Sequence, residues 1–440
     1  MKPVQPLGEE KVFKDPVHNY IHVQDRLIWT LINTPEFQRL RRIRQLGTSY
    51  LTFHGAEHSR FSHSLGVYEI TRRIISQFER GGYEDWPREE SLVALCAALL
   101  HDLGHGPFSH SIEEAFDMDH EEWTCRILLG DTEVNRVLEE AETGLAERVA
   151  SVIRKDYEKP IVVNLVSSPL DADRMDYLLR DAYFTGVNYG TIDVDRILRM
   201  LRPHNGRVVV KESGMHAIED YLMARYQMYW QVYFHPVTRS SDIVLRQIFR
   251  RAKELFDQGF AFKFLPYPLP ALFEGNIQVH DYLLLDEALV QTAFMQWTRE
   301  DDEILADVCH RFMQRRLYKY VETDLIDLET IDSIRNEFAR VGLHPQYDLE
   351  IDFPTDLPYD VFRPGDPKKE KQILLLDRQN RIQEISEVSD IVRSISGIHR
   401  GRYHLYYPQD KLEKVIHQLS EEVAAIFENK INPPQMEFEI

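Results

Sequence analysis

The string His101-Asp-Leu-Gly-His-Gly-Pro-Phe-Ser-His110 places four ionisable side chains within ten residues. His101 and Asp102 directly follow the apolar run Leu92–Leu100, so both side chains can reach one metal ion beside the end of a helix. Imidazole and carboxylate ligands together suit Zn, Fe, Mn or Mg. A lone His-Asp pair is more often a satisfied histidine at the end of an apolar helix. The neighbouring histidines and glycines favour the metal site here.

Two ligands do not fill a metal site, and two other strings supply further candidates. His63 lies in Arg60-Phe-Ser-His-Ser-Leu-Gly, and Asp173 lies in Leu170-Asp-Ala-Asp-Arg-Met-Asp-Tyr. Two histidines and two aspartates would hold one divalent ion and leave positions for water and substrate, as a catalytic site needs. Seven of the 18 histidines crowd into residues 54–120: His54, His58, His63, His101, His105, His110 and His120.

The elements that must position these residues are mostly helical. The pattern predicts a loose tail over residues 1–10, a hairpin over Lys11–Val23, a short strand over Arg207–Lys211 and a proline-rich loop over Phe264–Phe273. Helices are predicted over Asp25–Asn33, Pro35–Leu46, Ser62–Gln77, Glu89–Leu103, Ser109–Phe116, His120–Leu129, Thr132–Glu142, Gly144–Lys155, Pro169–Tyr183, Val194–Leu201, Met215–Phe234, Thr238–Gln258, Val279–Thr298 and Asp301–Lys319.

The character of the chain changes after about Leu343. Strands are predicted over Tyr347–Phe353, Gln372–Asp377 and Ile382–Val388, and a closing amphipathic helix over Gln409–Glu428. The sequence therefore predicts a mainly α fold, a large helical body with a small α+β C-terminal part.

Composition excludes several classes of protein. Hydrophobic residues make up 43% and charged residues 28% of the 440 residues, as in a folded globular chain. The longest apolar run is far shorter than a membrane span, and the N-terminus lacks the apolar core of a signal peptide. Three scattered cysteines suit a reducing compartment, so we expect a cytoplasmic protein. The net charge of −20 makes a nucleic-acid partner unlikely on electrostatic grounds.

These strings resemble the HD-domain metal-dependent phosphohydrolases, in particular the bacterial tetrameric dNTP triphosphohydrolases, which are similar to the vertebrate SAM-and-HD-domain enzyme. The resemblance follows the family's order over residues 11–321 and is weak over 345–440. It implies a regulatory N-terminal part at 1–48, an HD-domain catalytic body at 49–343 and a small α+β part at 344–440. The matching blocks are Lys11–His18, Pro35–Gly47, Arg60–Gly66, His101–His110, Asp171–Asp181, Ala224–Phe234 and Arg315–Val321.

The resemblance implies roles for the clustered residues. The implied metal ligands are His63, His101, Asp102 and Asp173, the same set that the residues themselves suggest. The triphosphate and its chemistry are assigned to Arg60, His105, His110, His120, Arg174, Tyr177, Asp181 and Arg225. Arginine and imidazole suit a polyanion. The 5′-oxygen must gain a proton to leave, and we expect His110 to donate it with Glu113, one helical turn later, orienting the ring.

The implied reaction is attack by a metal-activated water on the α-phosphorus, which releases a deoxynucleoside and inorganic triphosphate. By resemblance, Leu46 and Tyr233 form a wall against a 2′-hydroxyl and Gln45 contacts the 3′-hydroxyl. Ordinary core packing is the alternative for Leu46 and Tyr233. Phe234 stands where the vertebrate pattern has glutamine, which leaves polar base or sugar contacts at that position open.

A second set resembles an activating nucleotide site between subunits. It consists of Lys11, Val12, Asn33, Gln38, Arg41, Arg202, Lys211, Arg315 and Lys319. Such a basic stripe with amides could hold a triphosphate and contact a guanine edge. We therefore expect a guanine nucleotide activator and a homotetramer. Asn33 stands where the vertebrate pattern has an acid, so the activator's identity stays open, and a solvated basic helix face is the alternative reading.

Two other functions compete with a dNTP triphosphohydrolase. One is an HD-type phosphodiesterase that acts on nucleotide second messengers or nucleic-acid ends. The other is a nucleotide-sensing scaffold without turnover. The complete ligand set argues against the scaffold, and release of triphosphate would separate the first reading from the phosphodiesterase. The native metal and the preferred base stay open.

Overall fold

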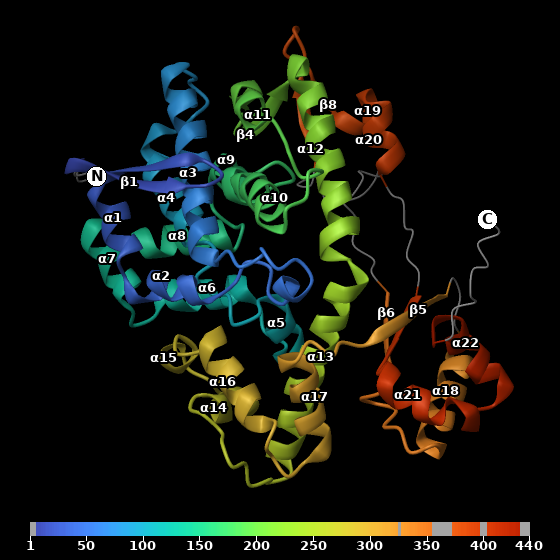
Figure 1. The fold of residues 1–440 in the computed structure, drawn as a ribbon. Coiled ribbons are helices and arrows are strands. Elements are labelled where there is room, and N and C mark those ends of the chain that lie inside the picture. Colours follow the sequence, from blue (N-terminus) through green and yellow to red (C-terminus); the bar gives the residue numbers. More distant parts are fainter. Residues whose placement is uncertain (1–5, 324–326, 354–371, 397–402, 432–440) are drawn as a thin grey trace. The chain divides into compact units, whose positions relative to one another are not determined.

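The computed structural model describes residues 6–323, 327–353, 372–396 and 403–431 (Figure 1). The chain divides into two compact units. The first unit comprises Met1–Val232, Leu265–Thr292 and Leu357–Ile398, and the second comprises Tyr233–Phe264, Ala293–Asp356 and His399–Ile440. Helices dominate and the sheets are small, so the predicted mainly α fold with a small α+β C-terminal part is confirmed.

The first unit holds most of the helices. Its helices are α1 (Arg26–Ile32), α2 (Pro35–Arg39), α3 (Arg60–Arg80), α4 (Ser91–Leu100), α5 (His110–Phe116), α6 (His120–Leu129), α7 (Glu133–Ala141), α8 (Leu145–Ile153), α9 (Pro160–Val166), α10 (Ala172–Thr185), α11 (Val194–Met200), α12 (Met215–Met228), α14 (Leu269–Phe273), α15 (Val279–Tyr282), α19 (Ile385–Val388) and α20 (Asp390–Ile395). Helix α16 (Glu287–Trp297) contributes residues to both units.

Helix α3 is the central support of the first unit. It packs against α4 and α10, the two helices whose ends carry the HD dipeptide and Asp173 (Figure 1). Helix α4 is buried on nearly every side, because its sequence, Ser91-Leu-Val-Ala-Leu-Cys-Ala-Ala-Leu-Leu, has no polar face to expose. The three helices thus hold His63, the HD dipeptide and Asp173 beside a buried apolar helix.

Two sheets complete the first unit. Strands β1 (Pro6–Asp15) and β2 (Asn19–Asp25) form the predicted antiparallel hairpin, with Lys11 opposite Val23 and Asp15 opposite Asn19. The second sheet has the order β3-β4-β7-β8, in which β4 and β7 are parallel and the other pairs antiparallel. Its strands are β3 (Leu201–His204), β4 (Arg207–Lys211), β7 (Leu374–Leu376) and β8 (Ile382–Glu384).

The second unit combines helices with an antiparallel sheet of order β5-β9-β6. Its elements are α13 (Pro236–Asp257), α17 (Glu303–Met313), β5 (Lys319–Thr323), α18 (Leu328–Arg340), β6 (Glu350–Asp352), β9 (Tyr403–Tyr407), α21 (Gln409–Val415) and α22 (Glu421–Ile431). Its core packs Phe338 of α18 and Tyr407 of β9 against Phe427 of α22.

Several predicted boundaries are wrong, and long-range pairing explains the most important one. The helix predicted over Pro35–Leu46 ends in a 3₁₀ turn at Arg42. There the chain extends and Arg44 pairs with Ser59, while the carbonyl of Ile43 accepts from the amide of Arg60 at 2.9 Å. This pairing brings Gln45 and Leu46 beside the start of α3.

The other corrections are local. Strand β1 begins at Pro6, within the predicted loose tail, and the proline-rich loop contains α14. The helix predicted over Val279–Thr298 is interrupted, because the Asp286 carboxylate accepts from the amide of Leu289 at 2.9 Å and starts α16 anew. The predicted closing helix is divided into α21 and α22, and α19 replaces the end of a predicted strand.

Some elements were missed altogether. They are α9, α18, α20, β3, β5 and β9. The helix predicted over Met215–Phe234 ends at Met228 and continues as the π-helical turn Tyr229–Tyr233. Within the described ranges, no helix is long and apolar enough to cross a membrane.

Candidate metal centre and active site

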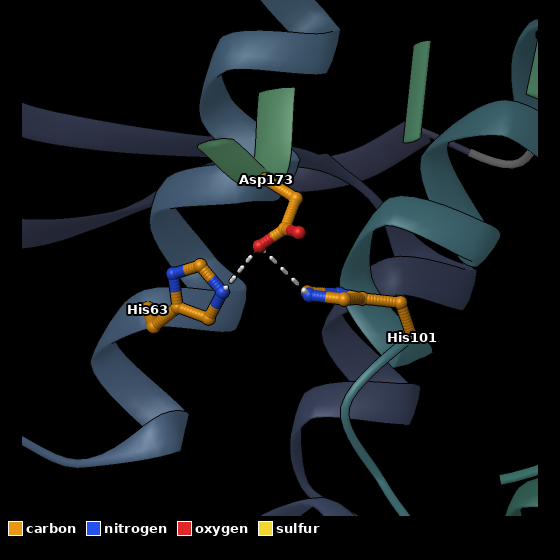
Figure 2. Close-up of side chains that lie close together, drawn as sticks. All are labelled: His63, His101 and Asp173. Carbon is orange, nitrogen blue, oxygen red and sulfur yellow. Dashed lines mark ion pairs between the residues drawn. The ribbon is translucent and has the colours of Figure 1, made fainter. Parts of the chain in front are cut away.

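The four predicted metal ligands meet at the junction of α3, α4 and α10. His63 lies in the first turn of α3, His101 caps the end of α4, and Asp173 lies in the first turn of α10. The Nε2 atom of His63 lies 3.0 Å from Asp173 Oδ1 and 3.6 Å from Asp102 Oδ2. The Nε2 atom of His101 lies 3.3 Å from Asp102 Oδ1 and 3.7 Å from Asp173 Oδ1. Figure 2 shows both rings directed at the Asp173 carboxylate.

His63, His101 and Asp173 have donor atoms close enough together to share one divalent cation, and Asp102 lies beside both histidines. Ligands bonded to such an ion at about 2.0–2.2 Å lie about 3.0–3.6 Å from one another. Both Nε2 atoms are buried, and among the described residues neither makes a well-aligned hydrogen bond. Buried nitrogens that face two carboxylates without such bonds are the arrangement expected of ligands, so the residues present fit the cation.

The electrostatics of the two histidines lead to the same conclusion. Burial lowers the pKa of His63, but the carboxylates of Asp173 and Asp176 outweigh it and raise this pKa to about 10. Burial also lowers the pKa of His101, and the neighbouring Asp102 and Asp173 raise it overall. The carboxylates thus favour positive charge between the two histidine rings, and a divalent cation bound there would supply that charge.

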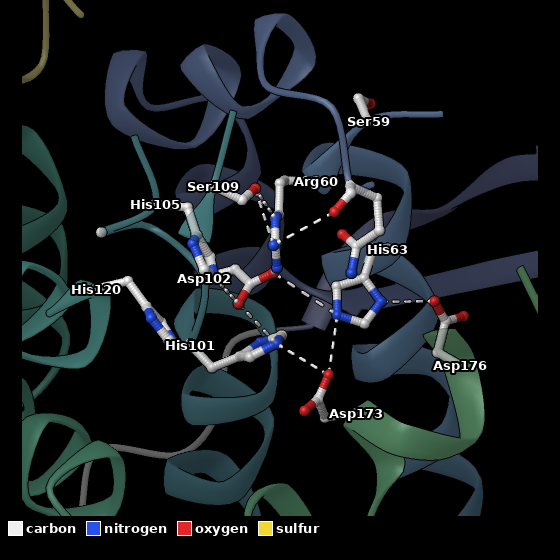
Figure 3. A network of polar contacts seen from close by, with 12 residues as sticks. Ser59, Arg60, His63, His101, Asp102, His105, Ser109, His120, Asp173 and Asp176 are labelled. Atoms are coloured by element: carbon white, nitrogen blue, oxygen red, sulfur yellow. Dashed lines mark hydrogen bonds and ion pairs between the residues drawn. The ribbon is translucent and has the colours of Figure 1, made fainter. Parts of the chain in front are cut away.

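Asp102 joins the metal centre to an arginine. Arg60 Nη1 donates to Asp102 Oδ2 at 2.7 Å, and both side chains are almost fully buried. Burial raises the pKa of Asp102, but Arg60, His101 and His105 hold it well below its usual range. Arg60 also donates to Ser109 Oγ from Nη2 at 3.0 Å (Figure 3). Arg60 therefore lies where it can contact both the carboxylate and a bound anion.

A second cluster lies beside Asp102, on the loop that follows α4 and on α5 and α6. Glu113 is surrounded by three imidazoles: its carboxylate lies 3.0 Å from His105 Nδ1, 3.2 Å from His110 Nδ1 and 3.1 Å from His120 Nδ1. The rings of His105 and His120 stack with centroids 3.9 Å apart. The predicted catalytic residues are thus brought together, and this group too has donor atoms close enough to hold a cation.

The members of this cluster differ in protonation. Burial, together with Arg60 and His120, lowers the pKa of His105 to about 4, so this ring is neutral near pH 7. Burial also lowers the pKa of His120, but Glu113 raises it overall. Burial raises the pKa of Glu113, yet hydrogen bonds with the three histidines hold it well below its usual value. The cluster therefore contains an ionised carboxylate against at least one ring that favours a proton.

The loop between α4 and α5, which carries His105, is tightly constrained. Phe108 and Ser109 adopt φ values of 59° and 48°, which non-glycine residues rarely do. Buried Arg39 stabilises this loop, because it donates to the carbonyls of Leu103 at 3.3 Å and His105 at 2.9 Å. Gly104 is required here, since a Cβ would lie 2.0 Å from the carbonyl oxygen of His120. This packing fixes the backbone between the two clusters.

The remaining predicted phosphate ligands lie on α10 and α12. Arg174 pairs with Asp171, and its Nε is buried without a hydrogen-bond partner among the described residues. Arg225 donates weakly to the Tyr229 hydroxyl at 3.4 Å, and its Nε is likewise buried without a partner there. Burial raises the pKa of Tyr177, which lies within the field of both arginines, well above its usual value. These cations thus keep donor capacity for an anion.

Other predicted residues are placed differently. Asp181 is buried and accepts from His58 Nε2 at 2.7 Å, so the structure commits its carboxylate to a histidine. Gln45 is buried and its carbonyl lies 3.4 Å from Arg60 Nη2, whereas Leu46 is half-buried. Tyr233 ends the π-helical turn and belongs to the second unit. The role of Asp181 toward the triphosphate, and those of Gln45, Leu46 and Tyr233 toward the sugar, stay predictions.

The residues predicted for an activator lie in both units. The structure joins Gln38 and Arg41 by a hydrogen bond of 2.8 Å, and Arg41 lies over the ring of Phe61 at 3.5 Å. Asn33 and Gln38 both donate to carbonyls at the end of α1. Lys11, Val12, Arg202 and Lys211 also belong to the first unit, and Arg315 and Lys319 to the second.

Sequence reasoning did not single out Asp176, which accepts a hydrogen bond from the metal-ligand candidate His63 at 2.8 Å (Figure 3). Nor did it assign a role to His58, the partner of Asp181. The spacing of Asp173, Asp176 and Arg180 on one face of a helix was the available signal.

Comparisons with known proteins agree with this geometry. Residues 60–181 match the HD domain, and residues 192–261 match the HD associated region. The Bacillus subtilis protein YwfO is 55% identical over 405 residues, which cover 92% of this chain and 93% of that protein. A Dictyostelium discoideum homolog of the deoxynucleoside triphosphate triphosphohydrolase SAMHD1 is 25% identical over 76% of this chain and 65% of its own length.

A solved structure shows the same fold. A phosphohydrolase from Bacteroides thetaiotaomicron superimposes with a TM-score of 0.80 at 29% identity, over 91% of this chain and 100% of that one. The HD match begins at Arg60 and ends at Asp181, and so contains all four metal-ligand candidates. The chain therefore belongs to the HD-domain phosphohydrolase family, in which its relatives include deoxynucleoside triphosphate triphosphohydrolases.

Proposed function

We propose that the protein is a metal-dependent dNTP triphosphohydrolase that releases a deoxynucleoside and inorganic triphosphate. The observation that carries the proposal is the convergence of His63 and His101 Nε2 on the carboxylates of Asp102 and Asp173, with arginine and histidine clusters beside it. Relatives named as deoxynucleoside triphosphate triphosphohydrolases support the substrate class.

The cation is Mg, Mn, Fe or Zn, held by His63, His101, Asp102 and Asp173. When bound, it supplies Lewis acidity, which neutralises phosphate charge and activates water for attack on phosphorus. Because Asp102 also accepts from Arg60, the same carboxylate would orient a cationic group toward the phosphates. His105, neutral near pH 7 and stacked on His120, has one N–H to donate and adds no charge to the site.

His110 is the proposed general acid toward the 5′-oxygen. Its Nδ1 lies 3.2 Å from Glu113, which leaves Nε2 as the atom that delivers the proton. The His110 side chain is 74% exposed, so a substrate can approach it. Glu113 orients the ring, as a carboxylate partner does for a histidine acid.

Binding of the rest of the substrate is assigned to the flanking residues. Arg174, Tyr177, Asp181 and Arg225 are proposed for the triphosphate, and within the described part of the chain both arginines have a buried Nε without a hydrogen-bond partner. Gln45, Leu46 and Tyr233 are proposed for the sugar, with the 2′-hydroxyl excluded by the last two. A guanine nucleotide would activate a homotetramer through the set that contains Arg41 and Arg315.

Product analysis tests the reaction. Pure protein is incubated with each dNTP, alone and in pairs, with Mg or Mn, and the products are separated by ion exchange. Equimolar deoxynucleoside and triphosphate are expected. Monophosphate with pyrophosphate, or cleavage of cyclic dinucleotides without any triphosphate, would replace this proposal by the phosphodiesterase reading. A single-turnover run with Asp102→Ala serves as the metal-site control.

A further inference from the structure

The ligand atom of His63 is set by a carboxylate that is not itself near the cation position. His63 Nδ1 lies 2.8 Å from Asp176 Oδ2, on the ring edge opposite Nε2. Both side chains are fully buried. An ionised carboxylate can only accept, so this contact keeps a proton on Nδ1 and makes Nε2 the ring nitrogen that can bind a metal ion.

Asp176 is itself held by two further buried side chains. His18 Nε2 lies 2.6 Å from Asp176 Oδ1. Arg180 donates to both oxygens, from Nε to Oδ2 at 2.9 Å and from Nη2 to Oδ1 at 3.0 Å. With His63, these contacts fill about four acceptor positions on the carboxylate, which is all that it offers. Asp176 therefore has one orientation.

The N-terminal hairpin is connected to Asp176 directly through His18 and indirectly through Arg180. Arg180 Nη1 also donates to Asp15 Oδ2 at 2.8 Å, and Asp15 is the last residue of β1. The other oxygen of Asp15 accepts the amides of Val17 and His18, each at 2.9 Å. The hairpin turn is thus folded around the Asp15 carboxylate in the geometry that aims His18 at Asp176.

The packing of α3 against α10 leaves room for this network only because residue 66 is glycine. A Cβ at Gly66 would lie 1.8 Å from Asp176 Oδ1 and 2.6 Å from Arg180 Nη2. The side chains of Asp176 and Arg180 occupy that space instead. A close approach of two helices, a buried arginine and a hairpin turn all converge on one carboxylate.

We infer that the N-terminal hairpin is a positioning element of the metal centre, in which Asp15 and His18 act through Arg180 and Asp176 to hold His63 in its metal-binding tautomer and orientation. Neither hairpin residue contacts the cation position. This inference rests on the proposed function for the existence of the metal site, and it adds that metal affinity depends on an element outside the HD match, which begins at residue 60.

Metal affinity tests the inference without any need for turnover. The full-length protein is titrated with Mn²⁺, and free Mn²⁺ is followed by its electron paramagnetic resonance signal. His18→Ala should weaken Mn²⁺ binding about 10–100-fold, the usual effect of losing an outer hydrogen-bond partner of a ligating histidine. His18→Gln, whose amide can donate from nearly the same place, should restore most of the affinity.

A matched control comes from the same hairpin. His22 on β2 is half-exposed and pairs with Glu10, so His22→Ala should keep wild-type affinity. Asp15→Asn is a second test with almost no change in shape, and it should weaken Mn²⁺ binding while circular dichroism stays unchanged. The inference is supported if His18→Ala and Asp15→Asn lose Mn²⁺ affinity and His22→Ala does not. If His18→Ala unfolds, Asp15→Asn alone decides the test.

Failure of the inference is distinguishable from failure of the proposed function. Wild-type Mn²⁺ affinity in folded His18→Ala and Asp15→Asn overturns the inference, while the metal site stands if Asp102→Ala no longer binds Mn²⁺. A wild-type protein that binds Mn²⁺ in the hairpin-dependent way, but releases no triphosphate from any dNTP, supports the inference and rejects the substrate. A wild-type protein that binds no Mn²⁺ overturns both.

Discussion

Asp102 lies close to four cationic or titratable side chains: Arg60, His63, His101 and His105. It faces His101 and His105 with Oδ1, each at 3.3 Å, and accepts from Arg60 with Oδ2. Its pKa lies well below the usual range because, against the effect of burial, Arg60 and the histidines favour the charged form. The carboxylate is therefore ionised whether or not a cation is bound, and it is ready to act as a ligand.

The first prediction follows from that position. Asp102→Ala should reduce metal affinity and turnover by more than about 100-fold, beyond the effect expected for an outer partner. Metal content is measured by mass spectrometry of the purified protein, and helicity by circular dichroism. Helicity should stay near wild type, since the apolar core of α4 is untouched. Normal turnover by metal-depleted Asp102→Ala would remove the site from the mechanism.

The second residue-scale prediction concerns the sugar. Tyr233 is half-buried at the end of the π-helical turn, and such turns often occur at functional sites. Tyr233→Ala should raise the ratio of ribonucleotide to deoxyribonucleotide turnover, because removal of the ring opens space for a 2′-hydroxyl. Tyr226→Ala, a half-buried tyrosine two turns earlier on α12, is the control. An unchanged ratio in folded Tyr233→Ala would make Tyr233 a packing residue.

At the scale of elements, the contact between α3 and α10 depends on Gly66. Gly66→Ala forces a methyl group into the Asp176 carboxylate, and overpacking of this kind typically costs about 1–3 kcal/mol. We expect a lower denaturant midpoint together with weaker Mn²⁺ binding. Gly8→Ala in β1 is the matched control, because its Cβ meets no atom within 4 Å. Equal midpoints for both variants would show that α10 can shift without cost.

A second element-scale prediction concerns α13 and β6 in the second unit. Arg239 donates to both oxygens of Asp352 at 2.8 Å, and the carboxylate is only 10% exposed. Arg239→Ala leaves that carboxylate buried without its partner, and should cost roughly 2–4 kcal/mol, somewhat below the value for a fully buried pair. Arg250→Ala on the same helix removes an exposed 3.6 Å contact and should cost about 0–1 kcal/mol.

The pH dependence of that difference has a definite sign. Burial raises the pKa of Asp352, but Arg239 lowers it overall, so the folded pKa lies below the ordinary value of 3.8. Stability from such a group is present above its unfolded pKa and is lost as pH falls through the folded one. The gap between wild type and Arg239→Ala should therefore be full at pH 7 and shrink below pH 3.8. A gap that widens in acid would contradict the ion pair.

Local sequence signals predicted the helical elements well and their ends less well. The helix after Thr34 was extended to Leu46 because Ile43 and Leu46 continue its apolar spacing. Pairing of Arg44 with Ser59 ends the helix earlier than that spacing predicts, and no local pattern indicates a partner fifteen residues away. The same limit applies to the site. The HD string and the string that begins at Arg60 are each visible as a local motif. The link from Asp15 to Asp176, in contrast, exists only once α10 and the hairpin have folded together.

At the scale of the whole molecule, the predicted activator set is divided between the two units. Arg41 is exposed, lies over Phe61 and is joined to Gln38, while Arg315 follows α17 in the second unit. A second triphosphate site has a use only if binding there changes activity or assembly. If the site lies between subunits, nucleotide affinity and oligomer stability must be reciprocal, because a ligand that favours one state is favoured by it.

The last prediction is that Arg41→Ala combined with Arg315→Ala abolishes activation by GTP or dGTP and leaves metal binding unchanged. Each charge-assisted phosphate contact contributes about 1.5–3 kcal/mol, so loss of two should weaken activator binding by at least about 100-fold. Rate is measured against activator concentration, with light scattering for the molecular mass of the assembly. Arg136→Ala combined with Arg335→Ala removes two exposed arginines and should change neither. Hyperbolic kinetics on every single dNTP, insensitive to guanine nucleotides and to both double variants, would reject the proposed activator site. The proposed hydrolytic site would still stand, because the metal ligands and the activator set share no residue.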